Sequence, residues 1–136
     1  MNPLSEFNDN SVTVKSIIDQ DQDFKKLFNI KNSIKYIDCK NMNINFDSGI
    51  NKLTLKGCSN IILHVNKIIS GIDIIKSNQI SITTDKKEPI YFLNIDNSNN
   101  IIFNIKKKLF NKIYVEIQDS TDIKFIDFNQ NLIKKY

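Results

Sequence analysis

The sequence predicts an all-β fold, a right-handed parallel β-helix of about five to six short coils with an N-terminal cap. Two observations carry this prediction. Apolar residues recur in four columns that keep the same changing interval, and within each repeat they alternate at i and i+2, the period of a strand. At 136 residues, the chain is long enough for one domain with a core of its own.

The first pair of columns follows a small residue that recurs at intervals of 19, 19, 21 and 22 residues. The small residues are Cys39, Cys58, Ser77, Ser98 and Ser120. The apolar residues three positions later are Met42, Ile61, Ile80, Ile101 and Ile123. The apolar residues two positions beyond those are Ile44, Leu63, Ile82, Phe103 and Phe125.

A second pair of columns occupies the other half of each repeat and keeps the same intervals. Its members are Ile34, Leu53, Ile72, Leu93 and Val115, and then Tyr36, Leu55, Ile74, Ile95 and Ile117. A repeat of roughly 20 residues cannot bury its own apolar face, whereas stacked copies share a continuous core. Stacking pairs each strand in parallel with its equivalent one repeat later, about 4.8 Å away. Right-handed winding is expected for such crossovers.

Turn-forming residues separate the alternating segments. They occur in "DSGINK" (47–52), "NKIISG" (66–71) and "TDKKEP" (84–89), and they favour strands joined by short corners over helices, which need apolar spacing near 3.6. A sandwich of antiparallel hairpins is the competing architecture, but the Asn-Gly turns that hairpins favour are missing.

A polar column precedes the first apolar column. Its members are Asn41, Asn60, Gln79, Asn100 and Asp122. Stacked side-chain amides can hydrogen-bond from coil to coil, and the same residue types are also simple turn formers. Both interpretations fit the sequence.

Residues 1–31 are expected to form the N-terminal cap, partly irregular, and residues 32–136 the β-helix domain. "SVTV" (11–14) is a candidate for one more strand, and residues 21–30 have a weak helical or capping pattern. A cap is needed because the open end of a β-helix exposes strand edges.

Composition and charge exclude several classes of protein. The net charge of +4 comes from lysine alone, because the chain has no arginine. Without the arginine fork and without a recognised motif, we expect no nucleic-acid partner. No apolar run approaches the roughly 20 residues that cross a bilayer, and the N-terminus lacks a signal pattern. We therefore expect a cytoplasmic protein with no membrane partner, in which Cys39 and Cys58 are small buried thiols.

The sequence contains no catalytic constellation. His64 falls on the outward phase of a strand, and no second histidine exists to complete a metal site. Asp73 and Glu116 are outward carboxylates two coils apart, whereas a polysaccharide-cleaving β-helix needs clustered carboxylates or calcium ligands. We expect neither an enzyme nor a bound metal or cofactor.

Three ordered motifs, "LTLKGCSNI", "SGIDIIKSNQISI" and "KKEPIYFLNI", resemble the C-terminal β-helix domain of cyclase-associated proteins, the actin regulators. The resemblance covers residues 33–125 and implies a module that binds monomeric actin. In that family a longer C-terminal extension contacts actin and exchanges strands in a dimer, but here only "NQNLIKKY" follows Phe128. A monomer, or a homodimer through an uncapped edge, is therefore expected.

The fold also resembles that of tubulin-cofactor C and related activators of small GTPases. Those proteins use a finger arginine, which this chain lacks. The alternative to an actin-monomer regulator is thus a non-enzymatic structural or adaptor β-helix that has kept the fold and lost actin binding.

Outward-facing and corner residues are the candidates for partner binding, and the lysines among them would speed encounter with acidic actin. These candidates are Lys56, Asp73, Lys76, Asn78, Ser81, Lys86 and Lys87.

Overall fold

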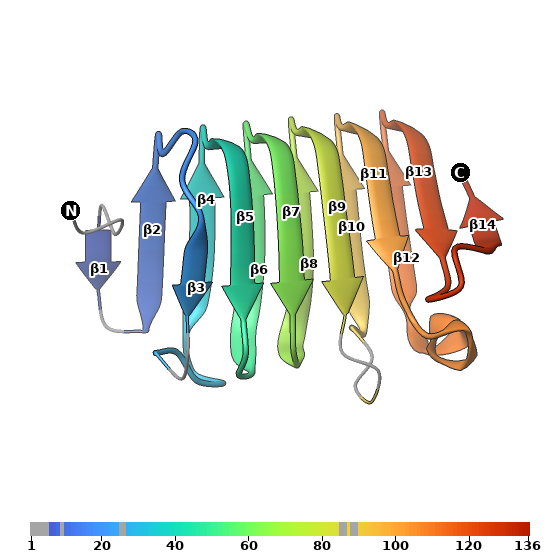
Figure 1. The fold of residues 1–136 in the computed structure, drawn as a ribbon, viewed down its shortest axis with the longest axis horizontal. Helices are drawn as coiled ribbons and strands as arrows, with labels where there is room; N and C mark the ends of the chain where they lie inside the picture. The colour runs from blue at the N-terminus through green and yellow to red at the C-terminus, as the bar shows by residue number, and fades with distance from the viewer. Residues whose placement is uncertain (1–5, 9, 25–26, 85–86, 88–89) are drawn as a thin grey trace.

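The computed structural model describes residues 6–8, 10–24, 27–84, 87 and 90–136, and it confirms the predicted parallel β-helix. Each coil contributes one strand to each of two sheets that face each other across the core (Figure 1). Moving along the molecule from the N-terminus, the strands run up one sheet and down the other in a right-handed sense (Figure 1). A short 3₁₀ helix, η1 (Lys107–Lys112), lies in the connection between β11 (Asn99–Asn104), the last strand but one of the second sheet's parallel set, and β12 (Tyr114–Gln118), the last strand of the first sheet.

In each sheet, six parallel strands carry one antiparallel strand at an end. The first sheet consists of β1 (Glu6–Asn8), β2 (Ser11–Lys15), β4 (Ser33–Ile37), β6 (Ile50–Lys56), β8 (Ile68–Ile75), β10 (Phe92–Asp96) and β12 (Tyr114–Gln118). The second sheet consists of β3 (Gln22–Phe24), β5 (Lys40–Phe46), β7 (Ser59–Val65), β9 (Asn78–Thr84), β11 (Asn99–Asn104), β13 (Thr121–Ile126) and β14 (Leu132–Lys135).

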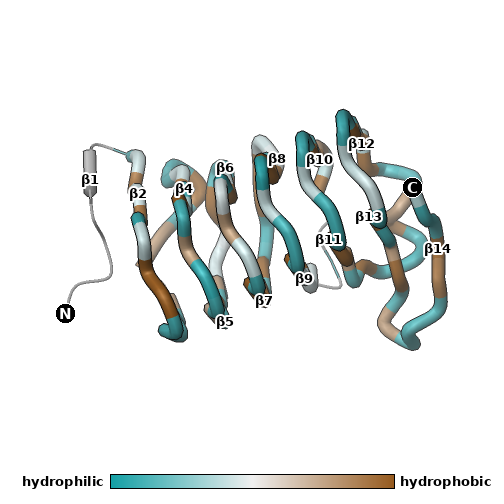
Figure 2. Tube along the Cα trace, turned by 90° about the horizontal axis from the view of Figure 1, so that it is seen from above, coloured by the Kyte–Doolittle hydropathy of each residue, from teal (hydrophilic) through white to brown (hydrophobic). Residues whose placement is uncertain are grey.

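The strand register confirms all four apolar columns. Leu53 faces Ile34 on one side and Ile72 on the other, and Ile80 likewise lies between Ile61 and Ile101. Apolar side chains are buried between the two sheets, and most outward positions are polar. Hydrophobic and hydrophilic residues therefore alternate repeatedly along the trace (Figure 2). Stacking like on like brings aromatic rings together, so that the centroids of Phe103 and Phe125 are 4.9 Å apart.

The corner between the two sheets explains the polar column. All five residues of that column have φ values of 54° to 57°, a left-handed conformation that asparagine and aspartate tolerate better than most residues. Among the described members of this column, side-chain hydrogen bonds link only the first three coils: the Asn41 amide donates to Asp19 (2.8 Å), and the Asn60 amide donates to Asn41 (2.7 Å). Turn geometry therefore accounts for the whole column, and an amide ladder for its first part.

The N-terminal segment forms a full coil, so the expected boundary between residues 31 and 32 is wrong. β2, which contains the candidate strand at residues 11–14, pairs in parallel with β4. β3 pairs in parallel with β5, where residues 21–30 had a weak helical or capping pattern. Lys25 and Lys26 lie outside the described residues. The repeat is hidden in the sequence because Gln22 occupies the column position of Ile44. The capping role belongs to β1, which pairs antiparallel with β2.

Gln22 is buried because its polar group has a partner inside the core. The hydroxyl of Tyr36, itself fully buried, donates a 2.8 Å hydrogen bond to the Gln22 side-chain oxygen. Desolvation by burial raises the pKa of Tyr36 well above its usual value. The Tyr36 hydroxyl and the Gln22 oxygen thus satisfy each other, whereas the buried Gln22 amide nitrogen has no hydrogen-bond partner among the described residues.

At the C-terminal end, β14 folds back and pairs antiparallel with β13 (Figure 2). The ring of Tyr136 packs edge-on against Phe125, with centroids 6.0 Å apart. β14 thereby covers the last parallel strand of the second sheet, while β12 is the outermost strand of the first sheet.

Candidate partner-binding surface

The structure places the predicted partner-binding residues on two faces and two corners. Lys56 and Asp73 belong to the first sheet, and Ser81 belongs to the second. Lys76 and Asn78 lie at the corner between β8 and β9, and Lys87 lies at the opposite corner, between β9 and β10. Lys86 lies outside the described residues. A single flat partner could not touch all of them.

Three of these residues gather at one end of the first sheet, where β6 and β8 run side by side. Lys56, the last residue of β6, is in register with Ile75, and the exposed Lys76 follows directly. Asp73 lies two residues before Ile75, and its carboxylate is 2.9 Å from the Lys52 ammonium group. We call Lys56, Asp73 and Lys76 the first-sheet cluster.

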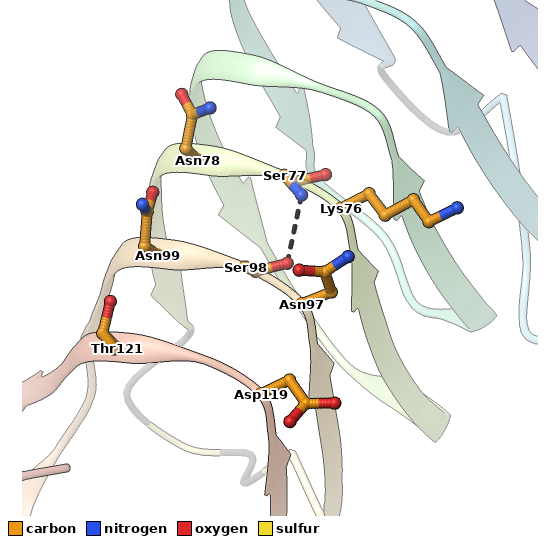
Figure 3. A pocket seen from close by; sticks show the side chains of 8 residues that line it. All are labelled: Lys76, Ser77, Asn78, Asn97, Ser98, Asn99, Asp119 and Thr121. Carbon is orange, nitrogen blue, oxygen red and sulfur yellow. Dashed lines mark hydrogen bonds between the residues drawn. The ribbon is translucent and has the colours of Figure 1, made fainter.

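A polar groove of about 430 Å³ adjoins the first-sheet cluster along the corner. Its walls come from three successive coils: Lys76, Asn97 and Asp119 form one row, and Asn78, Asn99 and Thr121 form the other (Figure 3). Lysine and aspartate at the two ends give the groove opposite charges along its length. Its amides and hydroxyl can hydrogen-bond polar groups of a partner.

The floor of the groove is a ladder of serines that joins the coils. The Ser77 amide donates to the Ser98 hydroxyl (3.0 Å, Figure 3), and the Ser98 amide donates to the Ser120 hydroxyl (3.0 Å). The Ser98 hydroxyl in turn donates to the Asp96 carbonyl (2.9 Å). Because each hydroxyl both accepts and donates, the groove has a fixed shape before any partner arrives.

The cysteines continue this ladder as free thiols, both buried as predicted. The Cys58 thiol donates to the Tyr36 carbonyl (3.5 Å), and the Cys58 amide donates to the Ser77 hydroxyl. The neighbouring Cys39 thiol, together with burial, raises the pKa of Cys58, and the Cys58 thiol lowers the pKa of Cys39. Water cannot reach either sulfur, since both residues are at most 1% exposed, so the pair has a structural place in the corner.

The described part of the chain brings together little that would support catalysis. His64 is exposed on the outer face of the second sheet, as predicted. Asp73 and Glu116 lie two coils apart, with Asn94 between them in register. Among the described residues, no group of three or more His, Cys, Asp or Glu side chains could hold a metal ion. The same residues include no helix with the length and apolar character needed to cross a membrane.

One exposed feature was not predicted from the sequence. Phe92 and Tyr114 begin β10 and β12, lie in register on the outer face of the first sheet, and have ring centroids 6.2 Å apart. The sequence could have revealed them, because each immediately precedes an inward column residue, Leu93 or Val115, and so must face outward. An aromatic residue on that phase points to solvent or to a partner.

Comparison with known proteins identifies the family of this chain. The family model described as adenylate cyclase associated (CAP) C terminal matches residues 1–125. The crystal structure of cyclase-associated protein from Cryptosporidium parvum superposes with a TM-score of 0.81 at 19% identity, over 93% of this chain and 76% of that chain, which shows a shared fold. A search of curated proteins found no match. The chain belongs to the family of CAP C-terminal domains.

Proposed function

We propose that this domain is a non-enzymatic cytoskeletal regulator that binds monomeric actin through the first-sheet cluster and the adjoining polar groove. The observation that carries the proposal is the family match over residues 1–125, because that family is one of actin regulators. The proposal places the domain in the cytoplasm, where actin monomers are found.

The architecture supports this choice of surface. A parallel β-helix is rigid, so little conformational entropy is lost when a partner docks on it. Lys56, at the end of β6, and Lys76, directly after the neighbouring strand β8, are both exposed. Their positive charge favours encounter with an acidic protein such as actin. Asn78 extends the same surface into the groove.

The proposal narrows the predicted set of residues. Lys56, Asp73, Lys76 and Asn78 are adjacent and act together. Ser81 lies on the opposite sheet and Lys87 at the opposite corner, so a partner bound to the first-sheet cluster would not reach them.

The test is a titration of the protein against fluorescently labelled actin monomers. Combining Lys56→Glu with Lys76→Glu should weaken binding at least about tenfold, since each interface hot spot is worth more than about 1 kcal/mol. Lys134→Glu with Lys135→Glu makes the same change of charge on β14 and should leave affinity unchanged. Association should slow as salt is added.

Two results would count against the proposal in different ways. A parent protein that does not bind actin at tens of micromolar would reject actin as the partner. Binding that survives the Lys56 and Lys76 changes would reject the chosen surface alone.

The second candidate is a structural or adaptor protein that has lost actin binding. Its specific support is β14, which pairs within its own chain and is therefore engaged rather than free to exchange with a second copy. This candidate predicts no response to actin in the same titration.

A further inference from the structure

Two large aromatic side chains lie next to each other in water on the outer face of the first sheet. Phe92 is 54% exposed and Tyr114 is 60% exposed, and their rings are tilted by 57° at 6.2 Å. An aromatic ring contributes a large area to whatever interface it enters, and adjacent exposed apolar side chains commonly mark an interaction site.

Packing within the domain explains part of this arrangement. Gly71, on β8, is buried against the backbone and Cβ of Phe92 on β10. Phe92 therefore covers a position that has no side chain of its own. Tyr114 has no such role, because β12 is the outermost strand of the first sheet. The pair therefore presents more apolar surface than the domain itself uses.

Three lysines lie on η1, close to the aromatic pair in the chain. η1 leads directly into the lower end of β12 (Figure 1). Lys107, Lys108 and Lys112 are exposed, and residues 97–115 contain no acidic residue. Glu116, on β12 itself, is the first acidic residue that follows. The result is a local excess of positive charge beside the rings.

The lysines stand on an anchored turn. Leu109 is buried, and the ring of Phe110 packs edge-on against Phe125, with centroids 5.1 Å apart. The Tyr114 amide donates a 2.7 Å hydrogen bond to the Tyr91 carbonyl, which ties the two coils together at this point. A partner would therefore meet a surface already in its bound shape.

We propose that Phe92, Tyr114, Lys107, Lys108 and Lys112, the aromatic–lysine corner, bind an acidic protein segment. Apolar side chains of the segment pack on the two rings, and its carboxylates face the three lysines. The corner lies at the opposite end of the strands from the first-sheet cluster, so this inference goes beyond actin binding and does not depend on it.

Charge and shape select this occupant. A second copy of the chain would bring lysines against lysines across a symmetric contact. A membrane surface is met best by aromatic side chains at a projecting tip, whereas these rings lie on the flat face of a sheet at its edge. A segment that carries both carboxylates and apolar side chains complements both halves of the corner.

The experiment uses the full chain and a fluorescent synthetic peptide in which glutamate pairs alternate with leucines. Fluorescence anisotropy should show binding by the parent that weakens with added salt. Phe92→Ser combined with Tyr114→Ser should reduce affinity at least about tenfold, and so should Lys107→Glu combined with Lys108→Glu. Lys134→Glu with Lys135→Glu is the charge-matched control and should bind like the parent.

Thermal melts show whether the aromatic variant folds. If the aromatic variant does not fold, the lysine variant still tests the corner, because its changes are all on exposed side chains. Peptides with lysine in place of glutamate, or serine in place of leucine, should not bind. The proposal is overturned if the parent fails to bind the acidic peptide, if neither variant weakens binding, or if vesicles of anionic lipid bind and the peptide does not.

Discussion

Gly71 is the single residue on which the outer face of the first sheet depends most. Its φ of +108° is strained for any residue with a side chain, and an added Cβ would lie 2.3 Å from the Phe92 carbonyl oxygen. We expect Gly71→Ala to lower the free energy of unfolding by at least about 2 kcal/mol, measured by urea denaturation. Gly49→Ala is the control, because its φ is not in the left-handed region and its Cβ would meet the Ile30 Cγ2 methyl at 3.2 Å and Lys67 at 3.4 Å, a much milder approach. Equal losses would contradict the close approach of β10 to β8.

Tyr36 should make the fold sensitive to alkali. Its folded-state pKa is raised by burial, while in the unfolded chain it is about 10. Above that pH the unfolded chain releases a proton that the folded chain keeps, so stability present below pH 10 is lost as the pH rises.

Tyr36→Phe separates the two contributions of this side chain. At pH 7 the variant should lose about 1 kcal/mol, because Gln22 loses its hydrogen-bond donor. Between pH 9 and about 11 its melting temperature should fall less than that of the parent. A parallel fall in both proteins would assign the alkaline loss to another group.

Among the structural elements, the corner from the first sheet to the second is held by its serine ladder. Ser98→Ala removes the acceptor of the buried Ser77 amide and should cost about 1 to 3 kcal/mol. Ser98→Cys repeats the residue that Cys39 and Cys58 place in the same corner, so its loss should be smaller. Chemical denaturation ranks the three proteins, and an alanine variant as stable as the parent would show that water replaces the hydroxyl.

At the scale of the whole molecule, β14 covers the edge of β13 that would otherwise be open. Removing residues 129–136 would strip the antiparallel partner from β13 and the Tyr136 ring from Phe125. An unpaired strand edge recruits other chains, so we expect the shortened protein to self-associate in light scattering while the full chain remains monomeric. A full chain that is already a stable dimer would instead indicate pairing through the edge of β12.

Much of this fold could be read from the spacing of apolar residues. The columns through Leu53, Ile74 and Ile80 set the register of every coil from β4 onward, because in a stacked repeat the interval along the chain is also the pairing across the sheet. The outward phase of His64 and the burial of Cys39 and Cys58 followed from the same alternation.

Other features were decided by contacts between distant residues. The first coil was hidden because Gln22 is polar, and only its hydrogen bond with Tyr36 makes that residue acceptable inside. The predicted partner-binding residues on the strands shared an outward phase, but that phase does not say which sheet they lie on, so Asp73 and Ser81 fell on opposite faces. The pairing of Phe92 with Tyr114 likewise arises because stacking brings residues 22 positions apart side by side. Alternation sets whether a side chain points in or out, whereas the path of the chain through space sets its neighbours.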